Sequence, residues 1–211
     1  MKNLLHFLTE TGKLKGKERR GWQIHQIKNA ETTAEHIFHL AILVYVLGKN
    51  KKLNLGRAIK MALIQDLCKI YAPDLTSYDA LLFKNGKKIT LEKILKSKPK
   101  IGCPTIEQRK QLVKLKYTLE KKALQELTSK LPADLRKEIR FLCEDYKNGL
   151  TNEARFVRQA EYLINVLQAV LYHKKHKQVP HSLWLRRARA VIDDPSLLGI
   201  LEEIEKKSKR K

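Results

Sequence analysis

Three residues that can bind a metal ion lie on helical faces that should be buried. His36 lies four residues before Leu40, so the two share one face of a predicted helix. Asp66 lies four residues after Ala62, and Glu161 lies on the flank of a later predicted helix. An unpaired carboxylate is costly to bury, so each acid needs a cation, a hydrogen-bond donor or a metal.

One arrangement satisfies all three residues. A histidine and two carboxylates from different helices can converge on a divalent ion, and this donor set suits Mn²⁺, Fe²⁺, Co²⁺ or Ni²⁺. Such an ion lowers the pKa of water and clamps a phosphoryl oxygen, which is the chemistry of a phosphate-ester hydrolase. Ordinary roles compete: His36 can be a core histidine, and Lys69 can be the ion-pair partner of Asp66. Arg158 and Gln168 can satisfy Glu161 locally. Spacing alone favours these ordinary roles.

The elements that must position these residues are predicted to be helices. Helical periodicity dominates and no segment alternates with period two, so the fold class is all-α. Thr32 and Thr105 begin capping patterns, and Thr151 caps a third long helix. We expect helices over about 1–12, 32–48, 55–70, 105–131, 134–148 and 151–172, with shorter ones from 182 and 194.

Residues 75–104 are predicted to be a long basic loop inserted in the helical domain. The segment is rich in proline, glycine and lysine, with one short helix expected near 91–95. We expect a helical domain over 1–195, followed by a C-terminal helix and basic tail over 196–211. The terminal sequence KKSKRK is predicted to be disordered.

The charge of the chain is strongly positive. Lysine and arginine total 44 against 22 acids, which gives a net charge of +22. Such a charge attracts polyanions, although solvated lysines on helix faces explain it equally well and are favoured. The chain has no apolar run of about 20 residues, which excludes a membrane span. Three widely spaced cysteines indicate a reducing compartment, and we expect a cytoplasmic protein.

Three segments in order carry a family resemblance: GWQIHQIKNAETTAEH, ALIQDLCKIYAPD and NEARFVRQAEYLINVLQA. Together they resemble the HD-domain phosphohydrolases, and most of all their 5'-deoxynucleotidase branch. The resemblance extends to about residue 172 and leaves out the loop 75–104 and the tail. It implies an HD-domain-like helical bundle, one divalent metal, a nucleotide or other phosphorylated small molecule as ligand, and a homodimer.

The family holds its metal with a histidine, a His-Asp pair and a distant aspartate. The resemblance assigns these positions to His36, Gln65, Asp66 and Glu161. Gln65 therefore stands where the pair has histidine, and its amide oxygen is a weak neutral ligand. Glu161 keeps the charge of aspartate with one more methylene. His39 is a candidate replacement ligand.

The resemblance also assigns residues that handle substrate. The glutamate that usually follows the His-Asp pair, and acts on the attacking water, falls on Lys69. Asp74 matches a loop aspartate near the sugar or the attacking water, and Arg19 and Trp22 match residues that contact the nucleotide. Lys69 replaces a base with a cation, which can repel a metal, pair with Asp66 or grip a phosphate.

Three functions remain open at this point. The first is a metal-dependent phosphohydrolase that acts on nucleoside 5'-monophosphates. The second is a catalytically degenerate relative that binds a nucleotide, with Lys69 supplying the positive charge. The third, ranked last because no recognition motif is present, is a nucleic-acid-binding protein that uses loop 84–100 and the tail.

Overall fold

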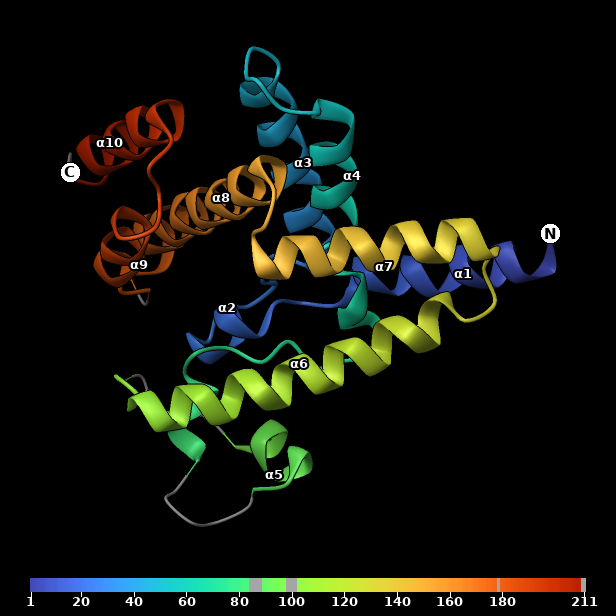
Figure 1. Ribbon diagram of the computed structural model, residues 1–211. Helices are drawn as coiled ribbons and strands as arrows, with labels where there is room; N and C mark the ends of the chain where they lie inside the picture. Colours follow the sequence, from blue (N-terminus) through green and yellow to red (C-terminus); the bar gives the residue numbers. More distant parts are fainter. Residues whose placement is uncertain (84–88, 98–101, 178, 210–211) are drawn as a thin grey trace. The chain divides into compact units, whose positions relative to one another are not determined.

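The computed structural model describes residues 1–83, 89–97, 102–177 and 179–209. The all-α prediction is confirmed, because these residues contain helices and no strand (Figure 1). The α-helices are α1 Lys2–Gly12, α2 Arg20–Ile24, α3 Thr33–Gly48, α4 Leu55–Ile64, α5 Leu91–Lys96, α6 Ile106–Thr128, α7 Ala133–Asn148, α8 Asn152–His176, α9 His181–Arg189 and α10 Pro195–Lys209. Short 3₁₀ helices are η1 Lys13–Gly16, η2 Leu67–Ile70 and η3 Asp79–Leu82. Within the described ranges, no helix has both the length and the apolar character needed to cross a bilayer.

The chain forms two compact units, each made of two segments. Unit 1 comprises Met1–Ala30 and Leu67–Arg136, and unit 2 comprises Glu31–Asp66 and Lys137–Lys211. The division falls between Asp66 and Leu67, so the predicted metal ligands and the predicted substrate residues belong to different units.

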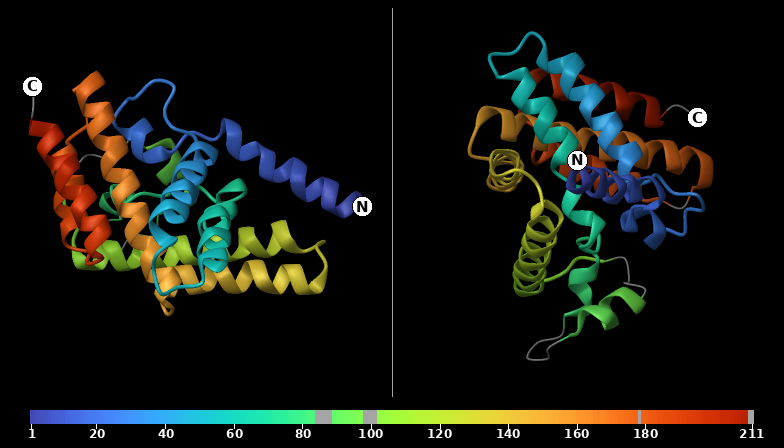
Figure 2. Two further views of the ribbon diagram at one scale, coloured as in Figure 1. Left: turned by 90° about the horizontal axis from the view of Figure 1, so that it is seen from above. Right: turned by 90° about the vertical axis from the view of Figure 1, so that its right-hand side faces the viewer.

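Unit 2 is built on the pair α3 and α4, which pack against each other and against α8. The two helices lie side by side in every view (Figures 1 and 2). Helices α9 and α10 pack on α8 and on each other, so α10 is part of this unit. The most deeply buried side chains of the core include Leu40, Val44, Met61, Val157, Leu163, Leu197 and Leu201.

Unit 1 is organised along the long helix α6, which packs against η2, η3 and α1. A smaller core here contains Leu75, Ala80, Phe83, Ile94 and Leu112. The short helix expected near 91–95 is confirmed as α5. The rest of the predicted loop is more ordered than expected, since η3 forms within it and buries Ala80. Residues 84–88 and 98–101 of that loop lie outside the described residues.

The predicted helix caps are confirmed. Thr32 and Glu35 form a complete capping box at the start of α3, and Thr105 and Gln108 form another at α6. The Thr151 hydroxyl accepts a hydrogen bond from the amide of Ala154 at the start of α8. These caps depend on local sequence alone, which is why they could be predicted.

Two expected boundaries were wrong. The helix expected over 55–70 ends at Ile64 and gives way to a turn and to η2. Residues 65–69 are all buried, and a regular α-helix with one buried stripe could not bury five consecutive side chains. The tail is also helical rather than disordered as far as Lys209, because Leu201 and Ile204 anchor α10 in the core. Residues 210–211 lie outside the described residues.

Candidate metal centre

A histidine and two carboxylates meet inside unit 2. His36 from α3, Asp66 just after α4 and Glu161 from α8 each offer one ligand atom, and these atoms lie within 4.8 Å of one another. His36 is fully buried and Asp66 is 5% exposed. The structure therefore brings together three of the four residues predicted as metal ligands. In sequence, Asp66 lies 30 residues after His36, and Glu161 lies 95 residues after Asp66.

The packing of unit 2 explains this convergence. The capping box fixes where α3 begins, and the core residue Leu40 shares the buried face of α3 with His36. The end of α4 is also fixed, because Cys143 of α7 lies with its Sγ 3.4 Å from the carbonyl oxygen of Ile64. Asp66 follows this point directly and so enters the interior.

Tyr146 was not identified from the sequence, yet it holds Glu161. Its hydroxyl donates a hydrogen bond to Oε2 of Glu161. Burial first, and then the charges of Glu161 and Asp66, raise the pKa of Tyr146 well above its ordinary value, so the hydroxyl stays a donor. The signal was a tyrosine on the apolar face of α7, one turn after Leu142, because a buried tyrosine hydroxyl needs a partner.

Glu31 is a second residue that the sequence did not reveal. Its carboxylate oxygen Oε1 lies 3.9 Å from Nδ1 of His36, while Oε1 of Glu161 lies 3.8 Å from Nε2 on the other side of the ring. The backbone amide of Glu31 donates to the hydroxyl of Tyr172 at 2.7 Å, which fixes this segment. The imidazole of His36 therefore lies between two carboxylates.

Two further residues, Gln65 and His39, were candidate ligands. Gln65 is 4% exposed, and its Nε2 has no hydrogen-bond partner among the described residues. A side-chain amide nitrogen is a hydrogen-bond donor, so Nε2 can donate to an acceptor such as a water or a phosphoryl oxygen. His39 is not a member of the cluster that His36 forms with the two acids.

The cluster fits a divalent ion. Nitrogen and oxygen ligands lie about 2.0–2.2 Å from such an ion, so two of them are at most about 4.4 Å apart. The three ligand atoms lie within 4.8 Å of one another, so small side-chain adjustments are enough to bring them to ligand–ligand distances of about 4.4 Å. One buried imidazole, one buried carboxylate and one partly buried carboxylate, with no thiolate among them, form a donor set for Mn²⁺, Fe²⁺, Co²⁺ or Ni²⁺.

The predicted substrate residues lie in unit 1. Nζ of Lys69 lies 2.9 Å from Oδ1 of Asp74, and their side chains are 6% and 11% exposed. Asp74 is thus one carboxylate partner of Lys69, a pairing that the sequence analysis did not predict. Arg19 lies over the ring of Trp22 at 6.0 Å, so these two predicted residues are also adjacent, with Trp22 almost completely buried.

Asp74 is a strongly stabilised anion. Burial by itself would raise its pKa, but the charges of Lys69, Arg19 and Lys116, with the hydrogen bond from Lys69, hold the pKa well below its usual range. The backbone amide of Arg20 donates to its second oxygen at 3.1 Å. A carboxylate held in this way is a poor proton acceptor.

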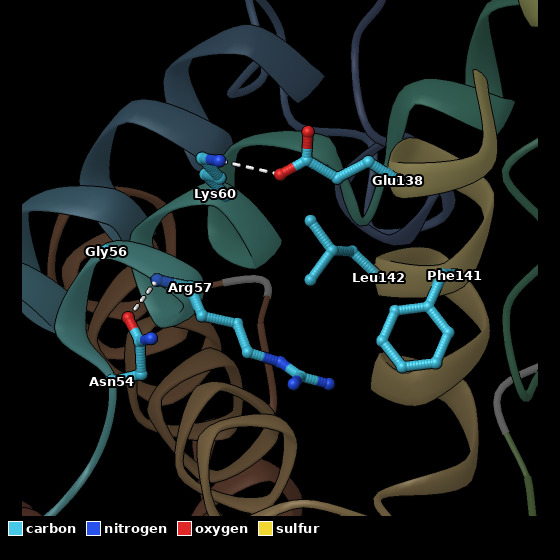
Figure 3. Close-up of a pocket in the computed structure, with 7 residues that line it drawn as sticks. All are labelled: Asn54, Gly56, Arg57, Lys60, Glu138, Phe141 and Leu142. Carbon is cyan, nitrogen blue, oxygen red and sulfur yellow. Dashed lines mark hydrogen bonds and ion pairs between the residues drawn. The ribbon is translucent and has the colours of Figure 1, made fainter. Parts of the chain in front are cut away.

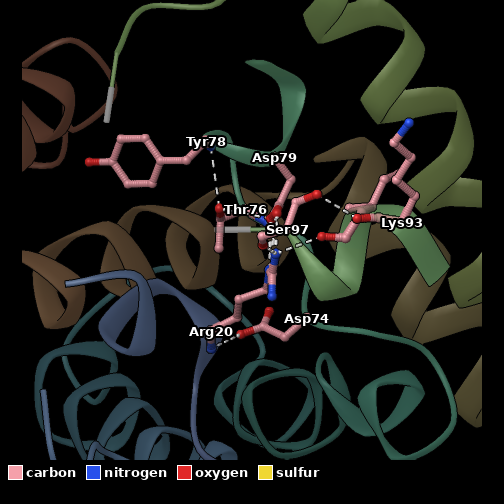
Figure 4. Close-up of polar contacts among 8 residues, drawn as sticks. Arg20, Asp74, Thr76, Tyr78, Asp79, Lys93 and Ser97 are labelled. Carbon is pink, nitrogen blue, oxygen red and sulfur yellow. Dashed lines mark hydrogen bonds and ion pairs between the residues drawn. The ribbon is translucent and has the colours of Figure 1, made fainter. Parts of the chain in front are cut away.

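Arg20 joins three parts of unit 1 (Figure 4). Its guanidinium donates to the fully buried carboxylate of Asp79 at 2.6 Å and to the carbonyl oxygens of Ile94 and Ser97 at 3.1 and 3.3 Å. Asp79 also accepts from the amide of Thr76 at 2.7 Å. The arginine therefore fixes η3 and α5 near Asp74.

A surface pocket of about 360 Å³ lies apart from the predicted residues. Figure 3 shows its lining side chains on α4 and α7, with Lys60 and Glu138 joined at 2.6 Å. The lining comprises Asn54, Gly56, Arg57, Lys60, Glu138, Phe141 and Leu142. None of these residues was predicted to be catalytic. Two charged side chains of the lining, Lys60 and Glu138, form an ion pair with each other.

A family model described as an HD domain matches residues 11–194. A protein named 5'-deoxynucleotidase HDDC2 from Dictyostelium discoideum is 30% identical over 193 residues, covering 88% of this chain and 86% of its own. The protein of the same name from Homo sapiens is 26% identical over 205 residues, covering 97% and 85%. These matches confirm the family resemblance, and the range of the family model spans the positions of the predicted site residues.

Solved structures share the fold. A conserved hypothetical protein from Pyrococcus furiosus superimposes with a TM-score of 0.67 at 23% identity, covering 96% of this chain and 99% of its own. A structure titled predicted metal-dependent phosphohydrolase, from Magnetospirillum magnetotacticum, gives a TM-score of 0.64 at 21% identity, covering 98% and 93%. The expected helical architecture is therefore confirmed.

Proposed function

The chain belongs to the HD-domain family, and from this premise we propose that it is a metal-dependent phosphohydrolase acting on nucleoside 5'-monophosphates. The observation that carries the proposal is the cluster of His36, Asp66 and Glu161, of which the first two are buried. Relatives that bear the name 5'-deoxynucleotidase support the class of substrate.

The ligands have distinct roles in this proposal. His36 offers a ring nitrogen, while Asp66 and Glu161 supply two negative charges inside the core. A divalent ion held there supplies a Lewis acid for a phosphoryl oxygen and lowers the pKa of water. Tyr146 keeps one oxygen of Glu161 engaged, so the other oxygen is left to face His36.

Gln65 and Lys69 define how this chain differs from the family pattern. The buried amide of Gln65 can orient a water or a phosphoryl oxygen, a role that needs no charge. Lys69, paired with Asp74, cannot accept a proton from water as a glutamate would. We therefore propose that the chain hydrolyses its substrate slowly. The reaction depends on the bound ion and has no carboxylate base at position 69.

Arg19, Trp22 and Asp74 are proposed to contact the nucleotide, on the basis of their match to the family's residues. The low pKa of Asp74 keeps it an acceptor, which suits a hydrogen bond from a sugar hydroxyl. Arg19 carries the charge that suits a phosphate.

Metal content and phosphate release test the proposal together. The purified protein should contain a divalent ion by elemental analysis and should release phosphate from deoxynucleoside 5'-monophosphates with Mn²⁺ or Co²⁺. His36→Ala should abolish both, while His39→Ala serves as the matched control. No bound metal together with no turnover would rule the enzyme out.

A second candidate function is favoured by the ion pair between Lys69 and Asp74. Here the chain binds a nucleotide without hydrolysing it. This candidate predicts thermal stabilisation by dAMP that survives EDTA. The double variant Gln65→His, Lys69→Glu separates the two candidate functions. If only that variant binds metal and hydrolyses nucleotides, the natural chain is a nucleotide-binding protein without hydrolytic activity.

A further inference from the structure

The exposed face of α3 in unit 2 is apolar. The exposed residues of this helix are Glu35, Phe38, Ile42, Tyr45 and Val46, and the exposed Lys49 follows its last turn. The four apolar side chains among them are between 46% and 68% exposed. A surface helix normally has polar side chains on its exposed face, and a contiguous apolar face indicates contact with another molecule. The opposite face of α3 is already in use, because His36, Leu40 and Val44 lie buried in unit 2.

The exposed residues are spaced symmetrically about Ile42. Glu35 lies seven residues before it and Lys49 seven residues after it. Phe38 lies four residues before it and Val46 four residues after it. With a rotation of about 100° per residue, all four lie within about 40° of Ile42 around the helix axis. These five residues, which we call the α3 stripe, have an acid at one end, a base at the other and apolar side chains between.

A stripe of this kind is complementary to itself. A two-fold axis through Ile42 places two copies of α3 antiparallel, with the apolar side chains of both copies against one another. Glu35 then lies opposite Lys49 of the partner subunit, and symmetry forms this pair twice. Within one chain the two charges cannot meet, because fourteen residues of helix separate them by about 21 Å. The bonds that Glu35 accepts from Thr32 both end on Oε2, so they are compatible with an ion pair at Oε1.

We infer that the α3 stripe docks against the same stripe of a second copy of this chain, antiparallel and centred on Ile42. A second copy is favoured over an unrelated protein because the stripe supplies the counter-charge for each of its own ends. The inference goes beyond the proposed function, which does not need a second copy. Because the contact involves one helix of each copy, we expect it to bury less than the about 1,200–2,000 Å² of a standard interface and to dissociate on dilution.

Sedimentation equilibrium of the full chain, from about 1 µM to about 200 µM, measures the association. The wild type should change from monomer to dimer as its concentration rises. Lys49→Glu places two acids opposite each other at both ends of the stripe and should raise the Kd of the dimer at least about tenfold. The double variant Glu35→Lys, Lys49→Glu makes the opposing charges opposite in sign again, so the dimer should return although the capping box is lost.

Two substitutions at Ile42 test the centre of the interface. Ile42→Asp places two carboxylates together on the two-fold axis and should leave the protein monomeric. Leu150→Asp, at an exposed leucine between α7 and α8, is the matched control and should dimerise like the wild type. In a background of Cys103→Ser, which removes the exposed native thiol, Ile42→Cys should form a disulfide between copies under mild oxidation, because a residue on the axis faces itself. Leu150→Cys should not.

A wild type that stays monomeric over the whole range would overturn the inference. So would a dimer that persists unchanged in both Lys49→Glu and Ile42→Asp. A folded double variant that remains as weak a dimer as Lys49→Glu would show that the two charges do not face each other. Circular dichroism and melting temperature confirm that each variant is folded, and phosphate release is measured separately, so the dimer and the proposed hydrolase can each fail alone.

Discussion

Lys69 and Asp74 form an ion pair in which Nζ lies 2.9 Å from Oδ1 and both side chains are almost completely buried. The pair lies in the segment of unit 1 that begins at Leu67, directly after Asp66 ends the first segment of unit 2. Because the lysine is a cation and the carboxylate has a depressed pKa, neither can act as a general base at neutral pH. Asp74 is therefore a poor candidate for a general base.

Breaking this pair on one side should destabilise the fold. Asp74→Asn leaves the buried Lys69 without its carboxylate, and we expect a loss of about 3–5 kcal/mol in the free energy of unfolding. Urea denaturation followed by circular dichroism measures the loss. The double variant Lys69→Met, Asp74→Asn should recover part of the stability, and strict additivity of the two single changes would contradict the coupling.

Asp74 should also make the fold sensitive to acid. Its pKa in the folded state is depressed below the ordinary value of 3.8, so its contribution is complete above that value and is lost as the pH falls below it. The free energy of unfolding should therefore fall with pH below about 4. Asp74→Asn should show a shallower fall over the same range, and identical slopes would count against this assignment.

Tyr146 should affect the affinity for metal through Glu161, without itself being a ligand. Tyr146→Phe removes the hydrogen bond to Glu161 and should weaken Mn²⁺ binding by about 10–100-fold. Calorimetric titration of the metal-free protein measures the affinity. Tyr45→Phe, an exposed tyrosine on α3, is the matched control and should bind like the wild type.

Metal should stabilise the wild type through Glu161. At a free Mn²⁺ concentration about 100 times the Kd, mass action adds about 2.7 kcal/mol to the free energy of unfolding. Glu161→Gln removes one of the two charged ligands, so the stabilisation should disappear while the metal-free protein still folds. Equal metal-induced shifts of Tm in the two proteins would show that the ion binds elsewhere.

Arg20 should contribute more to the free energy of unfolding than a residue in an exposed ion pair. Arg20→Met removes the partner of the fully buried Asp79 and the anchor of α5, with an expected loss of about 3–5 kcal/mol. Lys96→Met breaks an ion pair whose side chains are 75% and 73% exposed, so it should change stability far less. Thermal unfolding compares the two, and similar losses would refute the role of Arg20.

Much of the helical framework could be predicted because it depends on local interactions. Thr32 and Thr105 cap α3 and α6 through residues three positions away, and periodic apolar residues define the buried faces. The same periodicity predicted that His36 and Asp66 face the interior and that Glu161 lies on the flank of its helix. The meeting of these three side chains was a hypothesis that the packing of α3, α4 and α8 supports.

The partners of the charged residues were decided by the tertiary structure. The sequence predicted a helix through residue 70, in which Lys69 would lie one turn from Asp66. Because α4 ends at Ile64, Lys69 lies in η2, where Asp74 is an ion-pair partner that the sequence did not predict. Tyr146 of α7 donates a hydrogen bond to Glu161 of α8, and local periodicity does not predict this pairing between two helices. Sequence determines which faces are buried through local periodicity, whereas the partner of a buried polar group depends on where helices end and how they pack.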